Sequence, residues 1–319
     1  MLRVEKKKLR GRGGKLVASG HRKIIGDVAC SLDGSKIASV DWGGEILFWE
    51  PWQKDPVLKA KGHLRLWSAC WLQNDTQLLV GGDDGLELFD TSSGEPIGPR
   101  LAPNTSAYRV RVSRDGRFVA AHISNREEVR LVVWSTTEPV FTELHSFAHH
   151  KTTYSGFDFG EGSILSVTGQ GEITCRDLVT GEERWRRELA WAAHGLEVSP
   201  DGSRFAIVAA DGPRGKEGAA VRIHDSKDGS HIQSLVGFSP SYCNPVRFSR
   251  DGRRLATSAF PADAEQDLAI WDLNSGEIIW KESHARLEAA KLAFTPDGTT
   301  LVSAGSDKKL RFWDLSELK

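Results

Sequence analysis

The chain has 319 residues, of which 39% are hydrophobic and 27% are charged, and its formal net charge is −1. This composition is ordinary for a globular protein with a sizeable core, and the small net charge gives the whole molecule no strong electrostatic preference. No run of about 18 apolar residues is present and no apolar segment follows the charged N-terminus, so neither a transmembrane helix nor a signal peptide is expected.

The first fifteen residues, MLRVEKKKLRGRGGK, differ from the rest of the chain in charge. They contain seven Lys or Arg residues and one Glu, a net charge of +6 that leaves −7 for the remainder. Residues 1–14 are therefore predicted to be a basic, flexible arm. The arm could bind nucleic acid or an acidic partner, or it could be only a solubilising terminus. Its candidate nucleic-acid contacts are Lys6, Lys7, Lys8, Arg10 and Arg12.

After the arm, one pattern recurs along the whole chain. A short apolar segment leads into an Asp-Gly turn and a second apolar segment, as in SLDGSKIAS at 31–39 and SPDGSRFAI at 199–207. These turns fall near residues 33, 115, 201, 251 and 297, and two weaker copies, LQNDTQLLV at 72–80 and FGEGSILSV at 159–167, fill the gaps in steps of 40 to 50 residues. Asp-Gly favours the left-handed turns that join antiparallel strands, and a fixed period of this size indicates a repeat architecture.

Each unit continues with a third segment that ends in an aromatic residue and often an acid, such as ILFWE at 46–50, LAIWD at 268–272 and LRFWD at 310–314. A Gly-Glu type of turn and a fourth segment follow. No helical period of useful length appears, so the whole repeat region is predicted to be β structure.

These residues resemble the WD40-repeat family over about residues 15–315. The resemblance implies an all-β fold, a single seven-bladed β-propeller over residues 15–319. The final unit contains only three strands, and residues 15–21 (KLVASGH) are similar to the fourth strand at 57–63 (VLKAKGH). The N-terminal strand is therefore predicted to complete the last blade and close the ring, which removes the exposed strand edges.

In that family a His, a Ser, an Asp and a Trp form a buried hydrogen-bonded network within a blade. The resemblance implies such a network in the last blade, made by His284, Ser303, Asp307 and Trp313. The other blades are expected to carry it incompletely.

No catalytic or metal-binding spacing is present, so no enzyme activity, cofactor, metal or small-molecule substrate is expected. Five of the ten histidines stand before blades, where a recurring position indicates a structural role. An alternative is a propeller hydrolase with a constellation at the channel mouth that includes His122, Asp263 or Glu265.

Large aromatic residues recur in the entry loops of successive blades. Trp67, Tyr108 and Tyr154 each lie seven residues before the turn position of their unit. In propellers of this family these loops share one face, and Arg109 lies beside them. We expect a binding face there, because Trp, Tyr and Arg dominate protein-binding hot spots. The alternative is that the rings only pack between blades. The supporting residues are Arg65, Trp42, Trp191 and Tyr242.

The sequence therefore predicts a non-catalytic scaffold or adaptor that binds a protein or peptide and belongs to a multi-protein complex. The alternative is a nucleic-acid or ribonucleoprotein subunit that binds through the basic arm. A cytoplasmic location is expected, because the four cysteines include no C-x-x-C pair and no secretion signal is seen.

Overall fold

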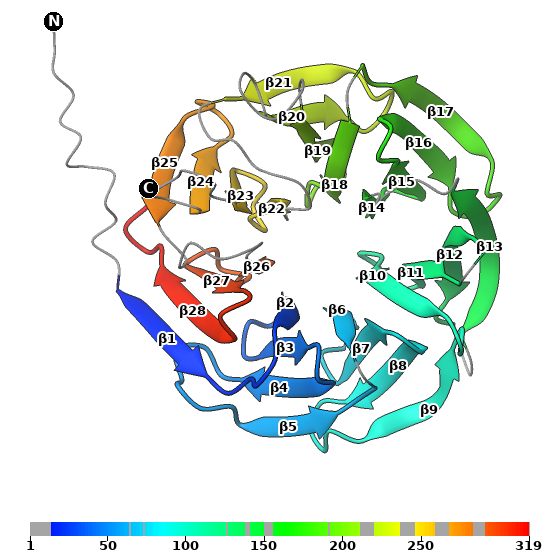
Figure 1. Ribbon diagram of the computed structural model, residues 1–319. Coiled ribbons are helices and arrows are strands. Elements are labelled where there is room, and N and C mark those ends of the chain that lie inside the picture. Colours follow the sequence, from blue (N-terminus) through cyan, green and yellow to red (C-terminus); the bar gives the residue numbers. More distant parts are fainter. Residues whose placement is uncertain are drawn as a thin grey trace, which may run out of the picture.

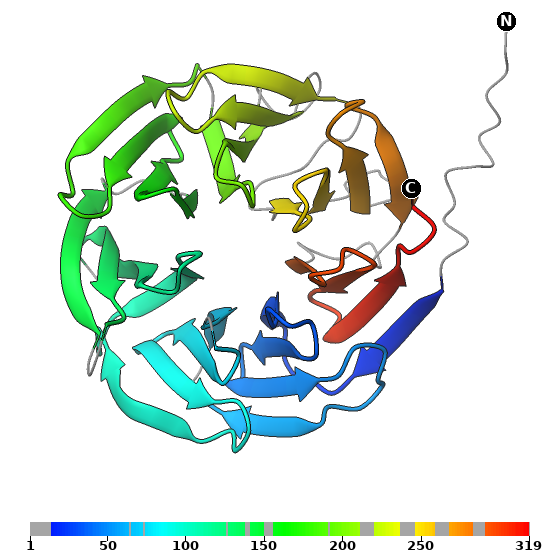
Figure 2. The same cartoon turned by 180° about the vertical axis from the view of Figure 1, so that it is seen from behind.

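The protein is a closed ring of seven four-stranded antiparallel sheets in the computed structural model (Figures 1 and 2). The structure describes residues 14–63, 65–72, 74–125, 127–137, 141–149, 156–190, 192–210, 220–236, 246–258, 268–282 and 291–318. Every regular element in these ranges is a strand, so the predicted all-β, seven-bladed propeller is confirmed.

The strands follow the blades in chain order. Blades one and two contain β2 (Ile25–Cys30), β3 (Ile37–Asp41), β4 (Glu45–Trp49) and β5 (Leu58–Lys61), then β6 (Leu66–Trp71), β7 (Gln77–Gly82), β8 (Gly85–Asp90) and β9 (Pro96–Leu101). Blades three and four contain β10 (Ser106–Val112), β11 (Phe118–Ser124), β12 (Val129–Ser135) and β13 (Thr142–His149), then β14 (Gly156–Gly160), β15 (Ser163–Val167), β16 (Glu172–Asp177) and β17 (Glu183–Glu188). Blades five and six contain β18 (Ala192–Val198), β19 (Arg204–Ala210), β20 (Ala220–Asp225) and β21 (His231–Leu235), then β22 (Val246–Phe248), β23 (Arg254–Ser258), β24 (Leu268–Asp272) and β25 (Ile278–Glu282). Blade seven contains β26 (Lys291–Phe294), β27 (Thr300–Ala304) and β28 (Lys309–Asp314), with β1 (Lys15–Ser19) as its fourth strand.

The ring is closed by the N-terminal strand, as predicted. β1 pairs with β28 in antiparallel register from Lys15 opposite Trp313 to Ser19 opposite Lys309. The ammonium of Lys15 also lies 4.7 Å from the centroid of the Trp313 ring. Because first and last strands share one sheet, every blade has four strands and the ring has no open seam.

Turns join each inner strand to the second strand of its blade, and five of these seven turns contain Asp-Gly. In the first blade the Gly34 N–H donates to the Ser31 carbonyl oxygen at 3.1 Å, and Gly34 has a φ of 76°. The Asp33 carboxylate accepts from the Ser31 hydroxyl at 2.7 Å and from the Ser35 N–H at 2.8 Å. A residue without a Cβ adopts this left-handed conformation at little cost, and the Asp side chain fixes the turn.

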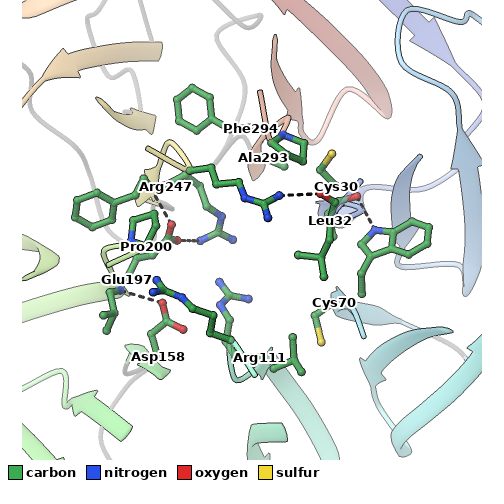
Figure 3. Close-up of a pocket in the computed structure, with 18 of the residues that line it drawn as sticks. Cys30, Leu32, Cys70, Arg111, Asp158, Glu197, Pro200, Arg247, Ala293 and Phe294 are labelled. Carbon is green, nitrogen blue, oxygen red and sulfur yellow. Dashed lines mark hydrogen bonds and ion pairs between the residues drawn. The ribbon is translucent and has the colours of Figure 1, made fainter. Parts of the chain in front are cut away.

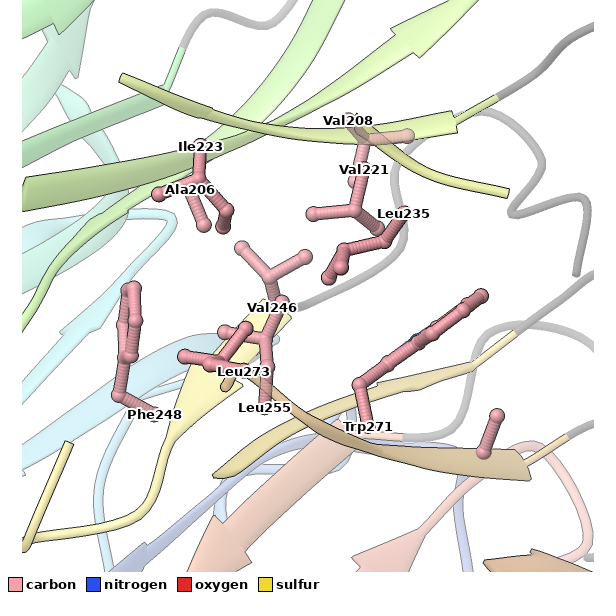
Figure 4. Close-up of a cluster of buried hydrophobic side chains, with 11 residues drawn as sticks. Ala206, Val208, Val221, Ile223, Leu235, Val246, Phe248, Leu255, Trp271 and Leu273 are labelled. Carbon is pink, nitrogen blue, oxygen red and sulfur yellow. The ribbon is translucent and has the colours of Figure 1, made fainter. Parts of the chain in front are cut away.

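The core is divided among the contacts between neighbouring blades. Val208 and Leu235 of the fifth blade pack with Val246, Leu255 and Trp271 of the sixth (Figure 4). Each of these side chains is at most 1% exposed. Burying a side chain of this size contributes about 1.5–3 kcal/mol, so the apolar strand positions supply most of the stability of the ring.

A complete His-Ser-Asp-Trp network lies in the first blade, and the expectation that blades other than the last carry it incompletely was wrong there. His21 contacts Asp41 Oδ2 through Nδ1 at 3.1 Å and Ser39 Oγ through Nε2 at 2.7 Å. The Trp49 indole N–H donates to the same Ser39 oxygen at 2.8 Å. The side chains of His21 and Asp41 are fully buried, so the network satisfies polar groups that water cannot reach.

In the last blade the Trp313 indole N–H donates to Ser303 Oγ at 2.8 Å. Asp307 pairs with Arg311 at 2.6 Å. His284 lies outside the described residues, so its place in the predicted network stays a prediction.

Candidate functional site

The strand order gives the ring two distinct faces. The connections from each fourth strand to the next inner strand lie at the same end of the blades as the turns between second and third strands. We call this end the entry face. The Asp-Gly turns lie at the opposite end, which we call the turn face.

Three aromatic rings from three successive blades form a row on the entry face. Trp42 lies in the β3–β4 turn, Trp67 lies in β6 and Tyr108 lies in β10. The ring centroids of Trp42 and Trp67 are 5.1 Å apart, and those of Trp67 and Tyr108 are 5.8 Å apart. We call these three residues the aromatic ridge. Both distances and the tilted geometries are typical of favourable aromatic pairs.

The ridge is partly solvent-accessible and is held in place by a polar contact. Trp42 is 39% exposed, while Trp67 and Tyr108 are half-buried. The Trp67 indole N–H donates to Asp83 Oδ1 at 3.0 Å, which fixes the ring orientation. The sequence left two hypotheses for these rings, a binding face or packing between blades. The ridge has features of both, because its rings pack across blades and also leave surface exposed.

The two arginines that the sequence placed beside these loops point in different directions. Arg65 is exposed next to the ridge and lies 3.9 Å from Asp83. Arg109 instead turns inward, where it donates to the Leu196 carbonyl oxygen and lies 5.8 Å from the centroid of the Phe157 ring. Burial and the nearby Arg111 and Arg247 lower the pKa of Arg109 to about 9. Arg109 thus reaches from the third blade to the fifth and is not part of the ridge.

Several predicted site residues lie outside the described residues. They include three aromatic residues of the expected binding face, the basic arm and two acids of the hydrolase alternative: Tyr154, Trp191, Tyr242, Lys6, Lys7, Lys8, Arg10, Arg12, Asp263 and Glu265. Of the predicted binding face, the structure brings together Trp42, Trp67, Tyr108 and Arg65.

A second candidate site, which sequence reasoning missed, is a cavity of about 610 Å³ in the central channel (Figure 3). One position of each inner strand faces this cavity. In blade order the seven residues are Ala29, Cys70, Arg111, Asp158, Glu197, Arg247 and Ala293. Four consecutive blades therefore present charges, and the other three present small or weakly polar side chains. Six of these residues lie one residue before the end of their inner strand, and Asp158 lies two before the end of β14. Aligning the repeats on their turns would therefore have revealed Arg111, Glu197 and Arg247, which each lie four residues before the turn Asp.

Charged groups in the cavity also join neighbouring blades. Glu197 Oε2 accepts from Arg247 Nη1 at 2.6 Å, and Glu197 Oε1 accepts from the Phe248 N–H at 2.9 Å. Asp158 Oδ2 accepts from the Val198 N–H at 2.9 Å. Burial by itself would lower the pKa of Arg247, but the negative charge of Glu197 outweighs burial and raises this pKa. The guanidinium therefore stays charged.

The described residues offer no assembled catalytic group. His122 is buried and packs edge-on against Phe157, with centroids 4.7 Å apart. Burial raises the pKa of both channel thiols, Cys30 and Cys70, to about 12, which leaves too little thiolate for a nucleophile at neutral pH.

One cluster has donor atoms close enough for a metal ion. Ligand atoms of His21, Asp41 and Glu45 lie within 4.8 Å of one another. Both ring nitrogens of His21 already contact Asp41 and Ser39 in the buried network. The network therefore accounts for two of the three residues, His21 and Asp41, without a metal. In the part of the chain that the structure describes, no helix is long and apolar enough to cross a membrane.

Comparisons with known proteins agree with this architecture. The family described as "WD domain, G-beta repeat" matches residues 14–50 and 284–314. The chain is 22% identical to apoptotic protease-activating factor 1 of Rattus norvegicus, over 78% of this chain and 19% of that protein. It is 25% identical to serine-threonine kinase receptor-associated protein of Gallus gallus, over 88% of this chain and 77% of that protein. It is 30% identical to nuclear distribution protein PAC1 of Arthroderma benhamiae, over 57% of this chain and 40% of that protein. The chain thus spans about a fifth of the first relative and about two fifths of the third.

Proposed function

We propose that this chain, a seven-bladed WD40 β-propeller, is a non-catalytic scaffold or adaptor that binds a protein or peptide on its aromatic ridge. The observation that carries the proposal is the contact of Trp42, Trp67 and Tyr108 in one partly exposed row across three blades. Large aromatic side chains of this kind supply much of the binding energy in protein interfaces.

The ridge is suited to binding because it is preorganised. Its three residues belong to strands and a tight turn of a closed ring, and Asp83 orients the Trp67 indole. Little conformational entropy is then lost when a partner binds. Arg65 adds a cationic group at the edge of the ridge. The proposal extends to Tyr154, Trp191 and Tyr242 as further contacts on the same face.

The names of two relatives, "protease-activating factor" and "receptor-associated protein", refer to activating or associating with another protein. These names support a role in protein complexes for this chain too. The proposal also includes a cytoplasmic location.

The test is affinity purification from native cell extract with tagged protein, at low and high salt. We expect proteins that are retained at high salt to be lost with a Trp42→Ala/Trp67→Ala/Tyr108→Ala variant. Trp52→Ala is a matched control, because Trp52 is 38% exposed but packs against Phe312 away from the ridge. Equal recovery with the triple variant and the control would contradict the proposal.

The same experiment tests the basic arm as the alternative. Binding of nucleic acid through residues 1–14 would fall steeply with salt, because released counterions drive it. It would be lost when those residues are deleted and retained in the ridge variant. If this pattern is found and no protein depends on the ridge for binding, the arm rather than the ridge is the functional element.

A further inference from the structure

The channel cavity contains more positive than negative side chains. Four arginines line it, Arg111, Arg114, Arg247 and Arg250, together with two acids, Asp158 and Glu197. This gives an excess of two positive charges. Because the cavity walls are protein, the field of these groups is screened less than it is on an open surface.

Both acids are already occupied. Asp158 accepts hydrogen bonds from the N–H groups of Phe159 and Val198, each at 2.9 Å. Glu197 accepts from Arg247 and the Phe248 N–H. These two carboxylates therefore stabilise the inner strands and one of the four arginines.

All four arginines donate hydrogen bonds to neutral carbonyl oxygens, and Arg247 Nε does so to the Leu292 carbonyl at 3.0 Å. Arg111 Nη1 donates to the carbonyl oxygen of the preceding residue, Val110, at 2.9 Å. From the Asp-Gly turns, Arg114 Nη2 donates to the Ser199 carbonyl at 3.3 Å and Arg250 Nη1 donates to the Leu32 carbonyl at 2.8 Å. Among the described residues, neither Arg111 nor Arg250 forms an ion pair with a carboxylate.

These contacts also position the guanidinium groups. Arg250 reaches from the sixth blade to Leu32 of the first, and Arg114 reaches from the third blade to Ser199 of the fifth. Each contact skips one blade, so the side chains are held across the channel at the turn face. In Figure 3, Arg111 and Arg247 approach the cavity from opposite walls.

We propose that this cavity binds a small polyanion that carries phosphate or carboxylate groups. A guanidinium binds both groups through paired, charge-assisted hydrogen bonds. The volume of about 610 Å³ lies in the range of small-molecule sites. Ala29 and Ala293 on the uncharged wall leave room for an organic portion. The site opens at the turn face, so it is distinct from the aromatic ridge and goes beyond the proposed function.

The test is isothermal titration calorimetry of the full chain with pyrophosphate and, separately, citrate, at constant ionic strength set with chloride. We expect saturable binding of at least one probe at a single site. Arg111→Met should weaken that binding by about tenfold or more, because it removes a charge-assisted contact. The preferred probe distinguishes phosphate from carboxylate recognition.

Two further variants keep the test decisive. Arg186→Met is the matched control, because Arg186 pairs with Glu172 and Glu183 on the fourth blade outside the cavity. It should bind the probe as tightly as the natural protein. Arg250→Met, at the exposed mouth, replaces Arg111→Met if thermal unfolding shows that the latter does not fold. Absence of saturable binding with both probes, or equal affinity in the cavity variant and the Arg186 control, would overturn the proposal.

Discussion

The first and fifth blades have the same strand register but different polar residues. In the first blade, Ser39 pairs opposite Leu47 and Ile37 opposite Trp49, and the buried network forms behind them. At the equivalent positions the fifth blade has Ile207 opposite Arg222 and Phe205 opposite His224. The His224 ring stacks on Phe205, with centroids 5.2 Å apart. The blade shape therefore does not depend on the His-Ser-Asp-Trp network.

The inner strands of these blades are also linked to their neighbours in different ways. In the first blade, Asp27 Oδ2 accepts from neutral donors of the second blade, the Ser68 hydroxyl at 3.0 Å and the Ala69 N–H at 3.2 Å. In the fifth blade, Glu197 accepts from a backbone N–H and from a guanidinium. The comparison teaches that apolar strand positions and turns define the repeat, while polar positions adapt to local needs.

Among the polar contacts of these two blades, the largest effect is expected at the ion pair of the fifth blade. Glu197→Ala should lower the free energy of unfolding by about 3 kcal/mol, because it leaves the Arg247 guanidinium, whose side chain is 17% exposed, without its carboxylate. Denaturant unfolding measures this loss. Glu172→Ala breaks an exposed pair with Arg186 and should cost less than about 1 kcal/mol. A loss at Glu197 no larger than at Glu172 would refute the distinction.

A smaller effect is expected in the network of the first blade. Ser39→Ala removes a hydroxyl that contacts both Trp49 and His21, so it should cost about 2 kcal/mol in unfolding free energy. The control is Ser35→Ala in the exposed turn of the same hairpin, where the loss should be about 0.5 kcal/mol. Equal losses at the two serines would show that the network contributes no more than a surface turn.

The turns are common to both blades, so they should respond alike to acid. Hydrogen bonds from Ser199 and Ser203 lower the pKa of Asp201 to about 2, and those from Ser35 and Ser31 lower the pKa of Asp33. Since an unfolded Asp has a pKa of about 3.9, this stabilisation is present above pH ~4 and is lost as pH falls toward 2.

The measurement is the melting temperature between pH 6 and pH 2.5. Asp33→Asn and Asp201→Asn should each make the melting temperature depend slightly less on pH. The pH-dependent part of the unfolding free energy should fall by less than about 1 kcal/mol in each variant, because both turns are solvent-exposed. A profile that flattens in only one variant would show that the two turns are not equivalent.

The aromatic ridge should matter less for stability than the rings of the core. Trp42→Ala should lower the unfolding free energy by about 1–2 kcal/mol, because a ring that is 39% exposed buries less area than a core ring. Trp49→Ala, at a fully buried ring, should cost about 3–5 kcal/mol. A large loss at Trp42 would mean that the ridge serves packing rather than binding.

The repeat itself was predictable because it depends on local signals. Asp-Gly pairs, alternating apolar residues and terminal aromatics recur in the sequence, and each is tied to a turn or a strand within one blade. The closure by residues 15–21 was also predictable, because a three-stranded final unit needs a fourth strand. The network of the first blade had its signal in His21, Ser39, Asp41 and Trp49 but was assigned only to the last blade.

The direction of individual side chains was not predictable in the same way. Arg65 and Arg109 lie beside equivalent loops, yet Arg65 is exposed and Arg109 is half-buried against Phe157. The choice depends on neighbouring blades, which lie about 40 to 50 residues away in the chain. The sequence by itself determined the seven repeats of strands and turns and the closed ring, since these arise from periodic local preferences. Only the tertiary structure decided that three aromatic rings meet in one ridge and that four arginines share one cavity, because both sites form where different blades come together.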